Sequence, residues 1–114
     1  MTIIYRIQDK DGRGPWKPGM SDRWVEYRDD HQLLHPWYIE FLDLKFEKGY
    51  RYGCGCETRK QLQRWITGSE YERLLIFGYR AVMIECEIVA ISEIQCVFRK
   101  RDKFNVGATE FNIY

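Results

Sequence analysis

The chain has 114 residues, with 18 Lys and Arg against 17 Asp and Glu, a formal net charge of +1. This balance argues against a strongly basic nucleic-acid coat and an acidic DNA mimic, so direct nucleic-acid binding is not expected. The length fits one domain over residues 1–114, since compact domains most often hold about 100–150 residues. No apolar stretch suits a membrane helix or a signal peptide, and a cytoplasmic protein is therefore expected.

The N-terminal segment predicts a strand followed by a loop. Residues 2–8, TIIYRIQ, are rich in β-branched and aromatic types, which favour a strand. Residues 9–19, DKDGRGPWKPG, hold three glycines and two prolines and predict a loop. This loop places the ring of Trp16 between the bases Arg13 and Lys17, which favours a binding surface. The alternative is an ordinary turn whose Trp folds back on the core.

The next segment is polar and then becomes amphipathic. Residues 21–34 predict a loop with one helical turn. Apolar residues then recur at helical spacing from Trp37 to Leu44, behind a proline, and predict a short helix over residues 36–46. We include Trp37 in the expected binding surface, because exposed aromatic residues are enriched at interface hot spots.

Residues 50–57, YRYGCGCE, predict a second strand in which glycine and cysteine alternate. Side chains alternate between the two faces of a strand, so Gly53 and Gly55 would leave one face bare. A bare face lets another backbone or a ligand come close; the alternative is a bulge or a bend. Cys54 and Cys56 would share the opposite face as small buried hydrophobic residues.

The cysteine and histidine spacings do not predict a metal site. Cys54 and Cys56 form C-G-C rather than C-x-x-C, and Cys86 and Cys96 lie ten residues apart in apolar runs. We therefore expect reduced, metal-free thiols. His31 and His35 are spaced for one helix face, but a proline follows His35 directly, so we interpret both as loop histidines.

Two capping boxes predict two short helices. A T-x-x-Q box beginning at Thr58 opens a helix over residues 59–66. An S-x-x-E box beginning at Ser69 opens a helix that reaches Phe77, and Gly78 supplies the left-handed position after it. We expect these helices to be structural.

The C-terminal third predicts the remaining strands. The apolar run over residues 79–100 must fold back, so we expect strands at 80–87 and 94–100. The tail over residues 102–114 is loop-like, and its last four residues, FNIY, suit an edge strand. The fold class expected is α+β: a small mixed or antiparallel sheet of four to five strands with two or three short helices on one face.

Three stretches, YRIQDKDGRGPWKPG, YGCGCETRKQLQRW and GYRAVMIE, together resemble short proteins of bacteriophages and bacterial prophages. The resemblance covers about residues 3–100 and implies a phage-type accessory protein. Such proteins commonly bind a host or defence-system protein, and anti-CRISPR inhibitors are one class. It therefore implies a protein partner and steric action without a cofactor, through Arg13, Trp16, Lys17 and Trp37. It names no target and no oligomeric state.

A second resemblance concerns the fold. A first strand with Tyr-Arg, a glycine-containing second strand leading into a helix, and a Gly-Tyr-x-x-Val strand are similar to the minimal ADP-ribosyltransferase core. The resemblance implies NAD as cofactor, with Arg6 on the pyrophosphate and residues 56–58 at the second strand. Either Glu85 or Glu93 would orient the ribose. The usual Ser-Thr-Ser is absent from the chain. NAD-dependent transfer is thus the alternative to protein binding.

Overall fold

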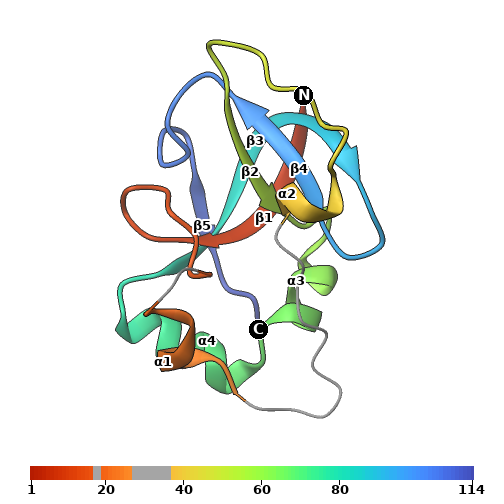
Figure 1. The fold of residues 1–114 in the computed structure, drawn as a ribbon. Helices are drawn as coiled ribbons and strands as arrows, with labels where there is room; N and C mark the ends of the chain where they lie inside the picture. Colours follow the sequence, from red (N-terminus) through yellow and green to blue (C-terminus); the bar gives the residue numbers. More distant parts are fainter. Residues whose placement is uncertain (17–18, 27–36) are drawn as a thin grey trace.

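The computed structural model describes residues 1–16, 19–26 and 37–114. Figure 1 shows a small sheet with short helical segments packed around it. In chain order the elements are β1 (Thr2–Gln8), α1 (Ser21–Trp24), α2 (Trp37–Glu40), β2 (Arg51–Gly55), α3 (Arg59–Trp65), α4 (Gly68–Ile76), β3 (Arg80–Ile91), β4 (Cys96–Lys100) and β5 (Thr109–Phe111). The expected α+β fold with a small antiparallel sheet is confirmed.

The sheet is antiparallel throughout the described residues. Its strands follow the order β1-β3-β4-β2, and β5 pairs with the first part of β3. The long strand β3 serves both halves of the sheet: its N-terminal half pairs with β1 and its C-terminal half with β4. A register shift between Ile88 and Ala90 lets β3 continue to Ile91, which makes it longer than the sequence predicts.

A single bridge closes the sheet between β1 and the end of β2. The amide of Tyr5 donates to the carbonyl of Cys56 at 2.8 Å, and the amide of Cys56 donates back to the carbonyl of Tyr5 at 2.8 Å. The path β1-β3-β4-β2 therefore returns to β1, as in a very small barrel. Side chains on one face of β1 point into this ring, and those on the other face point out of it.

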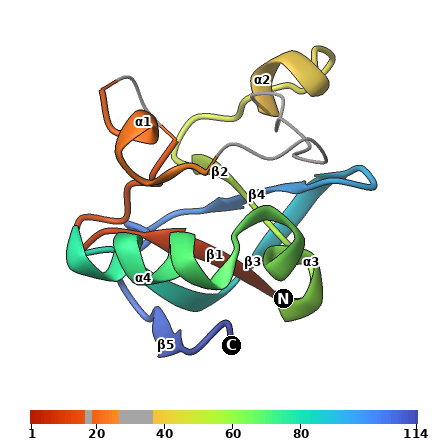
Figure 2. The ribbon, with the colours of Figure 1, turned by 90° about the horizontal axis from the view of Figure 1, so that it is seen from below.

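Two apolar clusters form because side chains of β1 alternate between the inside and the outside of this ring. The inner cluster is built from Ile4 of β1, Ile84 and Cys86 of β3, and Phe98 of β4, each fully buried. The outer cluster joins Ile7 and the other face of β1 to α3 and α4. Figures 1 and 2 show α3 and α4 below the sheet in the view of Figure 1, with α1 in front of α4 and α2 in front of the sheet. The sequence predicted that the helices lie on one face of the sheet, and this prediction is wrong.

The two longer helices have side-chain caps. Thr58 accepts a hydrogen bond from the amide of Gln61, as the first capping box predicts. The second box lies two residues before the predicted one: Thr67 and Glu70 cap α4 reciprocally. Thr67 rather than Ser69 is the cap because an extended backbone at Thr67 lets α4 begin at Gly68.

The amphipathic segment behind residue 36 is shorter than predicted. Helix α2 ends at Glu40 instead of continuing to residue 46, and a turn follows in which the amide of Leu44 donates to the carbonyl of Phe41. Leu42 is 82% exposed and Phe46 is 60% exposed. A short helix is marginal without burial of its apolar face, which explains why only one turn forms.

The tail adds the expected edge strand in a different place. β5 comprises Thr109–Phe111 and pairs with Ala81–Met83 of β3, instead of spanning residues 111–114. Ile113 is fully buried beneath α3, and its carbonyl accepts hydrogen bonds from Arg59 and Gln63. Across the described ranges, no helix has the length and apolarity needed to cross a membrane.

Candidate functional site

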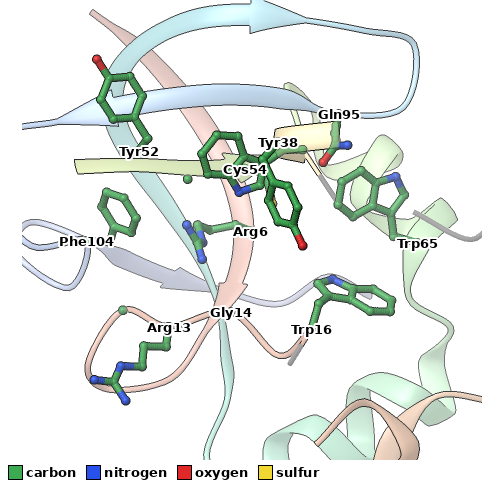
Figure 3. Close-up of a pocket in the computed structure, with 13 residues that line it drawn as sticks. Arg6, Arg13, Gly14, Trp16, Tyr38, Tyr52, Cys54, Trp65, Gln95 and Phe104 are labelled. Atoms are coloured by element: carbon green, nitrogen blue, oxygen red, sulfur yellow. The ribbon is translucent and has the colours of Figure 1, made fainter. Parts of the chain in front are cut away.

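A cavity of about 460 Å³ opens where the first strand, the loop after it and α2 meet. Figure 3 shows its lining residues converging from separate segments of the chain. They are Arg6, Gly12, Arg13, Gly14, Trp16, Trp37, Tyr38, Tyr52, Gly53, Cys54, Trp65, Gln95 and Phe104. Its volume falls within the range of about 300–1,000 Å³ that is typical of small-molecule sites.

Arg6 is the charged group of this cavity. It is 8% exposed, and its side chain lies on the inner face of β1 with Ile4 and Gln8. Its guanidinium carbon is 5.1 Å from the ring centre of Phe104 and 5.5 Å from that of Phe98. Nε and Nη1 are buried and have no hydrogen-bond partner among the described residues. Burial lowers the pKa of the guanidinium, because desolvation disfavours its charged form.

The bare face of β2 makes room for Arg6, which confirms that the glycines there allow close approach. A Cβ atom on Gly53 would stand 2.7 Å from Nη1 of Arg6 and 2.8 Å from Cε2 of Phe104. A Cβ atom on Gly55 would stand 3.2 Å from the carbonyl oxygen of Tyr5. On the loop, a Cβ atom on Gly14 would stand 3.2 Å from Nη2 of Arg6. Glycine thus lets two backbone segments pack against one guanidinium.

The aromatic walls are held by further rings outside the cavity. Trp16 packs edge-on against the fully buried Trp24 at 4.5 Å between ring centres. Trp37 meets Phe46 at 5.8 Å, and Phe46 meets Tyr52 at 4.7 Å. These contacts fix the positions of three wall residues before any ligand arrives.

Hydrogen bonds tie two further parts of the lining to the sheet. Gln8 donates from Nε2 to the carbonyl of Phe104 at 3.0 Å, which holds that ring beside Arg6. Gln95, in the turn between β3 and β4, donates to Glu40 of α2 at 3.3 Å. Helix α2 is therefore linked to the sheet at the cavity mouth.

The structure brings three of the four predicted binding residues together. Arg13, Trp16 and Trp37 all line the cavity, and Lys17 lies outside the described residues. Trp16 is 36% exposed, so it both packs on Trp24 and faces the opening. Figure 3 shows the guanidinium of Arg13 turned away from that of Arg6. Arg13 is accordingly a rim residue, whereas Arg6 lies inside.

The three residues named for NAD-dependent transfer are not brought together. Glu85 is an exposed residue of β3 opposite Ile3, on the outer face of the sheet. Glu93 is exposed in the turn between β3 and β4. Neither lines the cavity that contains Arg6. Glu85 and Glu93 therefore do not lie beside Arg6 as the ADP-ribosyltransferase resemblance implies.

The four thiols are free, and burial disfavours their charged thiolate form. Cys56, Cys86 and Cys96 are buried, whereas Cys54 is half-buried on the cavity wall. Burial raises the pKa of Cys86 to about 11 and that of Cys96 to about 12, and it also raises the pKa values of Cys54 and Cys56. In the part of the chain that the structure describes, no three His, Cys, Asp or Glu residues gather as metal ligands. His31 and His35 lie outside that part.

An exposed apolar patch lies beside the cavity, on α2 and the turn after it. We define the aromatic patch as Tyr38, Leu42 and Phe46, which are 61%, 82% and 60% exposed. Ring contacts through Trp37 connect Tyr38 and Phe46. Only Tyr38 of the patch also lines the cavity.

Sequence reasoning missed most of the cavity wall. Tyr38, Tyr52, Trp65, Gln95 and Phe104 come from five separated segments, and no spacing rule connects them. The one usable signal was the Gly-Cys alternation of β2, which indicated that something approaches Gly53. The high aromatic content, 16%, carried no information on which rings face the solvent.

A protein-family model described as the bacteriophage T4 Y00F protein matches residues 1–112, nearly the whole chain. No curated protein and no solved structure matches.

Proposed function

Because this chain belongs to the bacteriophage T4 Y00F protein family and is a phage accessory protein, we propose that it binds a host or defence-system protein inside the host cell. It acts sterically and needs no cofactor for this binding. In its most specific form the proposal is an inhibitor of the anti-CRISPR kind, which blocks a defence protein by covering its working surface.

The aromatic patch carries the proposal. Three large apolar side chains within nine residues, Tyr38, Leu42 and Phe46, stand more than half exposed on one short segment. Exposed apolar side chains that gather in this way are typical of interaction surfaces, whereas single exposed ones are ordinary. Tyr and Trp residues are enriched where binding energy concentrates, and Trp16 and Trp37 lie next to the patch on the cavity wall.

The patch favours a partner with an apolar surface. The charged residues of its segment, Glu40, Asp43, Lys45, Glu47 and Lys48, mix both signs, so they give no strong attraction for a charged surface. The binding energy must therefore come mainly from apolar burial. A stable interface also needs about 800 Å² from each partner, so the contact must extend beyond the patch onto Trp16 and its loop.

The test starts from affinity purification of the tagged protein from a bacterial host and identification of what copurifies. The partner is then purified and mixed with the protein in the absence of any cofactor. We expect a complex on a sizing column. Leu42→Gln should weaken it at least about tenfold, and Ile76→Gln should leave it unchanged.

Ile76 is a matched control, since it is 81% exposed against 82% for Leu42 and lies at the end of α4. Equal affinities for the two variants would contradict the proposed surface. The inhibitor form is tested separately, by plating a phage targeted by CRISPR–Cas on cells that express the protein. Unchanged restriction across the defence systems tried, together with a partner of no defence role, would contradict that form alone.

A further inference from the structure

We propose that the cavity around Arg6 binds a small molecule in which a flat ring is joined to one anionic group, as in a nucleoside monophosphate. This site shares Trp16, Trp37 and Tyr38 with the protein interface proposed above, but Leu42 and Phe46 do not line it, and the buried Arg6 belongs to the cavity alone. The cavity would let the phage protein respond to, or sequester, such a molecule.

The first argument is the state of the Arg6 head group. A guanidinium that is more than nine-tenths buried normally has a carboxylate or several carbonyl oxygens as partners. Here Nε and Nη1 have no hydrogen-bond partner among the described residues, and the guanidinium lies beside the rings of Phe98 and Phe104. An anion entering the cavity would accept hydrogen bonds from donors that are already in place.

The second argument is that Arg6 belongs to the cavity surface. It is one of the lining residues, and Figure 3 shows its head group lying among the rings of the site rather than beneath them. The backbone at Gly53 and Gly14 packs closely against Nη1 and Nη2 and holds the head group in place at the cavity wall. The planar donors of arginine suit two oxygens of one phosphate or carboxylate.

The third argument concerns the walls. The rings of Trp16, Trp37, Tyr38, Tyr52, Trp65 and Phe104 all border the cavity. Flat aromatic surfaces stack with nucleobases and other flat rings without requiring a particular hydrogen-bond pattern. Six rings in one cavity with the Arg6 guanidinium therefore match a ligand with a ring at one end and an anion at the other.

The surroundings also favour an anion. An open groove adjoins the cavity and shares Gly12, Arg13, Tyr52 and Phe104 with it. This groove adds Arg51 and Lys103, both exposed, and one acidic residue, Asp11. Three bases against one acid at the entrance raise the local concentration of anions.

The test uses the purified protein alone, so that the result does not depend on a protein partner. Trp16, Trp37 and Trp65 line the cavity, which makes intrinsic fluorescence a direct readout of its occupancy. The probes are the common nucleoside 5′-monophosphates, the matching nucleosides, inorganic phosphate, and indole-3-acetate as a ring with a carboxylate. Titrations are repeated while the Nε–H signal of Arg6 is followed by NMR.

We expect saturable one-to-one binding of at least one monophosphate or of indole-3-acetate. The matching nucleoside and inorganic phosphate should each bind at least about tenfold more weakly. A preference for the monophosphate over indole-3-acetate would identify phosphate as the anion, and the reverse would identify carboxylate. The Arg6 signal should shift on binding, because its donors gain an acceptor.

Variants then test the role of Arg6. Arg6→Gln should weaken binding of the preferred probe at least about tenfold, while Arg13→Gln, at the rim, should change it far less. If Arg6→Gln fails to fold, Tyr38→Ala is the second variant, since Tyr38 is 61% exposed and forms part of the wall. It should weaken the ring-bearing probe.

Two results would overturn the proposal. One is the absence of any fluorescence change or Arg6 signal shift with every probe at millimolar concentration. The other is equal binding of a monophosphate and its nucleoside, which would mean that Arg6 does not meet the anion. Neither result depends on whether a host protein binds the aromatic patch, so the two proposals fail independently.

Discussion

The guanidinium of Arg6 lies 5.1 Å from the ring centre of Phe104, and the missing side chain of Gly53 is what allows the two to meet. The contact joins the first strand to the loop between β4 and β5, about a hundred residues apart in the chain. Both residues line the cavity, so this contact forms part of its wall.

Replacing Gly53 by alanine should therefore destabilise the fold. The new Cβ would stand 2.7 Å from Nη1 of Arg6 and 2.8 Å from Phe104, and overpacking of this kind costs about 1–3 kcal/mol. Gly68→Ala is the control, because no atom lies within 4 Å of its added Cβ and it sits at the start of α4. Urea unfolding of both variants measures the difference. A Gly53→Ala variant as stable as Gly68→Ala would disprove the close approach.

Replacing Arg6 by methionine should make the empty protein more stable. Methionine fills much of the volume of the arginine stem, and it removes a buried charge whose Nε and Nη1 lack a hydrogen-bond partner among the described residues. The cost of burying such a charge exceeds what the ring contacts return, so we expect a gain of about 1 kcal/mol or more. Arg13→Met, at an exposed position, should stay within about 0.5 kcal/mol. A clear loss of thermal stability in Arg6→Met would show that the charge is satisfied in the native state.

The cap of α4 provides a test of the helix start. Thr67 accepts a hydrogen bond from the amide of Glu70 at 3.1 Å, and Glu70 accepts one from the amide of Thr67 at 2.8 Å. Thr67→Ala should lower the free energy of unfolding by about 1 kcal/mol. Ser69→Ala, at the position that the sequence pattern favours, should cost less, since Ser69 is exposed and does not cap the helix. If Ser69→Ala proved more destabilising than Thr67→Ala in chemical denaturation, the helix would begin two residues later than the structure places it.

The buried thiols predict a loss of stability at alkaline pH. Burial raises the pKa values of Cys86 to about 11 and Cys96 to about 12, from an ordinary value of 9.0. Above pH 9 the unfolded chain loses these protons while the folded protein keeps them, so the unfolding free energy falls as pH rises. Below pH 9 the two thiols contribute no slope. Cys86→Ala should show a shallower decline between about pH 9 and 11 in urea titrations, and an unchanged slope would contradict the burial.

Trp16 tests the link between the cavity rim and partner binding. Its ring is held by Trp24 and is 36% exposed at the opening. Trp16→Ala should weaken binding of the copurified partner by about 2 kcal/mol or more if Trp16 is a hot spot. Circular dichroism of the variant provides the control for folding. An unfolded variant would mean that Trp16 serves the core, and a folded variant with full affinity would remove it from the interface.

The sequence by itself determined the local features of this protein. β-branched and aromatic runs fixed the first strand at residues 2–8, and Thr58 and Gly78 marked where helices begin and end. These features depend on neighbours within a few residues, so propensity and capping rules identify them. The alternating glycines of β2 likewise indicated a close approach. The capping pattern failed at α4, where the neighbouring Thr67 could also cap the helix. The amphipathic pattern failed at α2, whose apolar face has no other element to pack against among the described residues.

Only the tertiary structure decided which side chains approach Gly53 and where the site lies. The bridge between Tyr5 and Cys56 closes the sheet, and this closure turns Arg6 inward while Glu85 stays on the outer face. The cavity collects rings from loops, strands and helices that share no periodicity. Contacts between residues so far apart in the chain depend on how the whole sheet closes, and no local pattern encodes that. The buried position of Arg6 thus follows from topology, although its place on the first strand follows from the sequence.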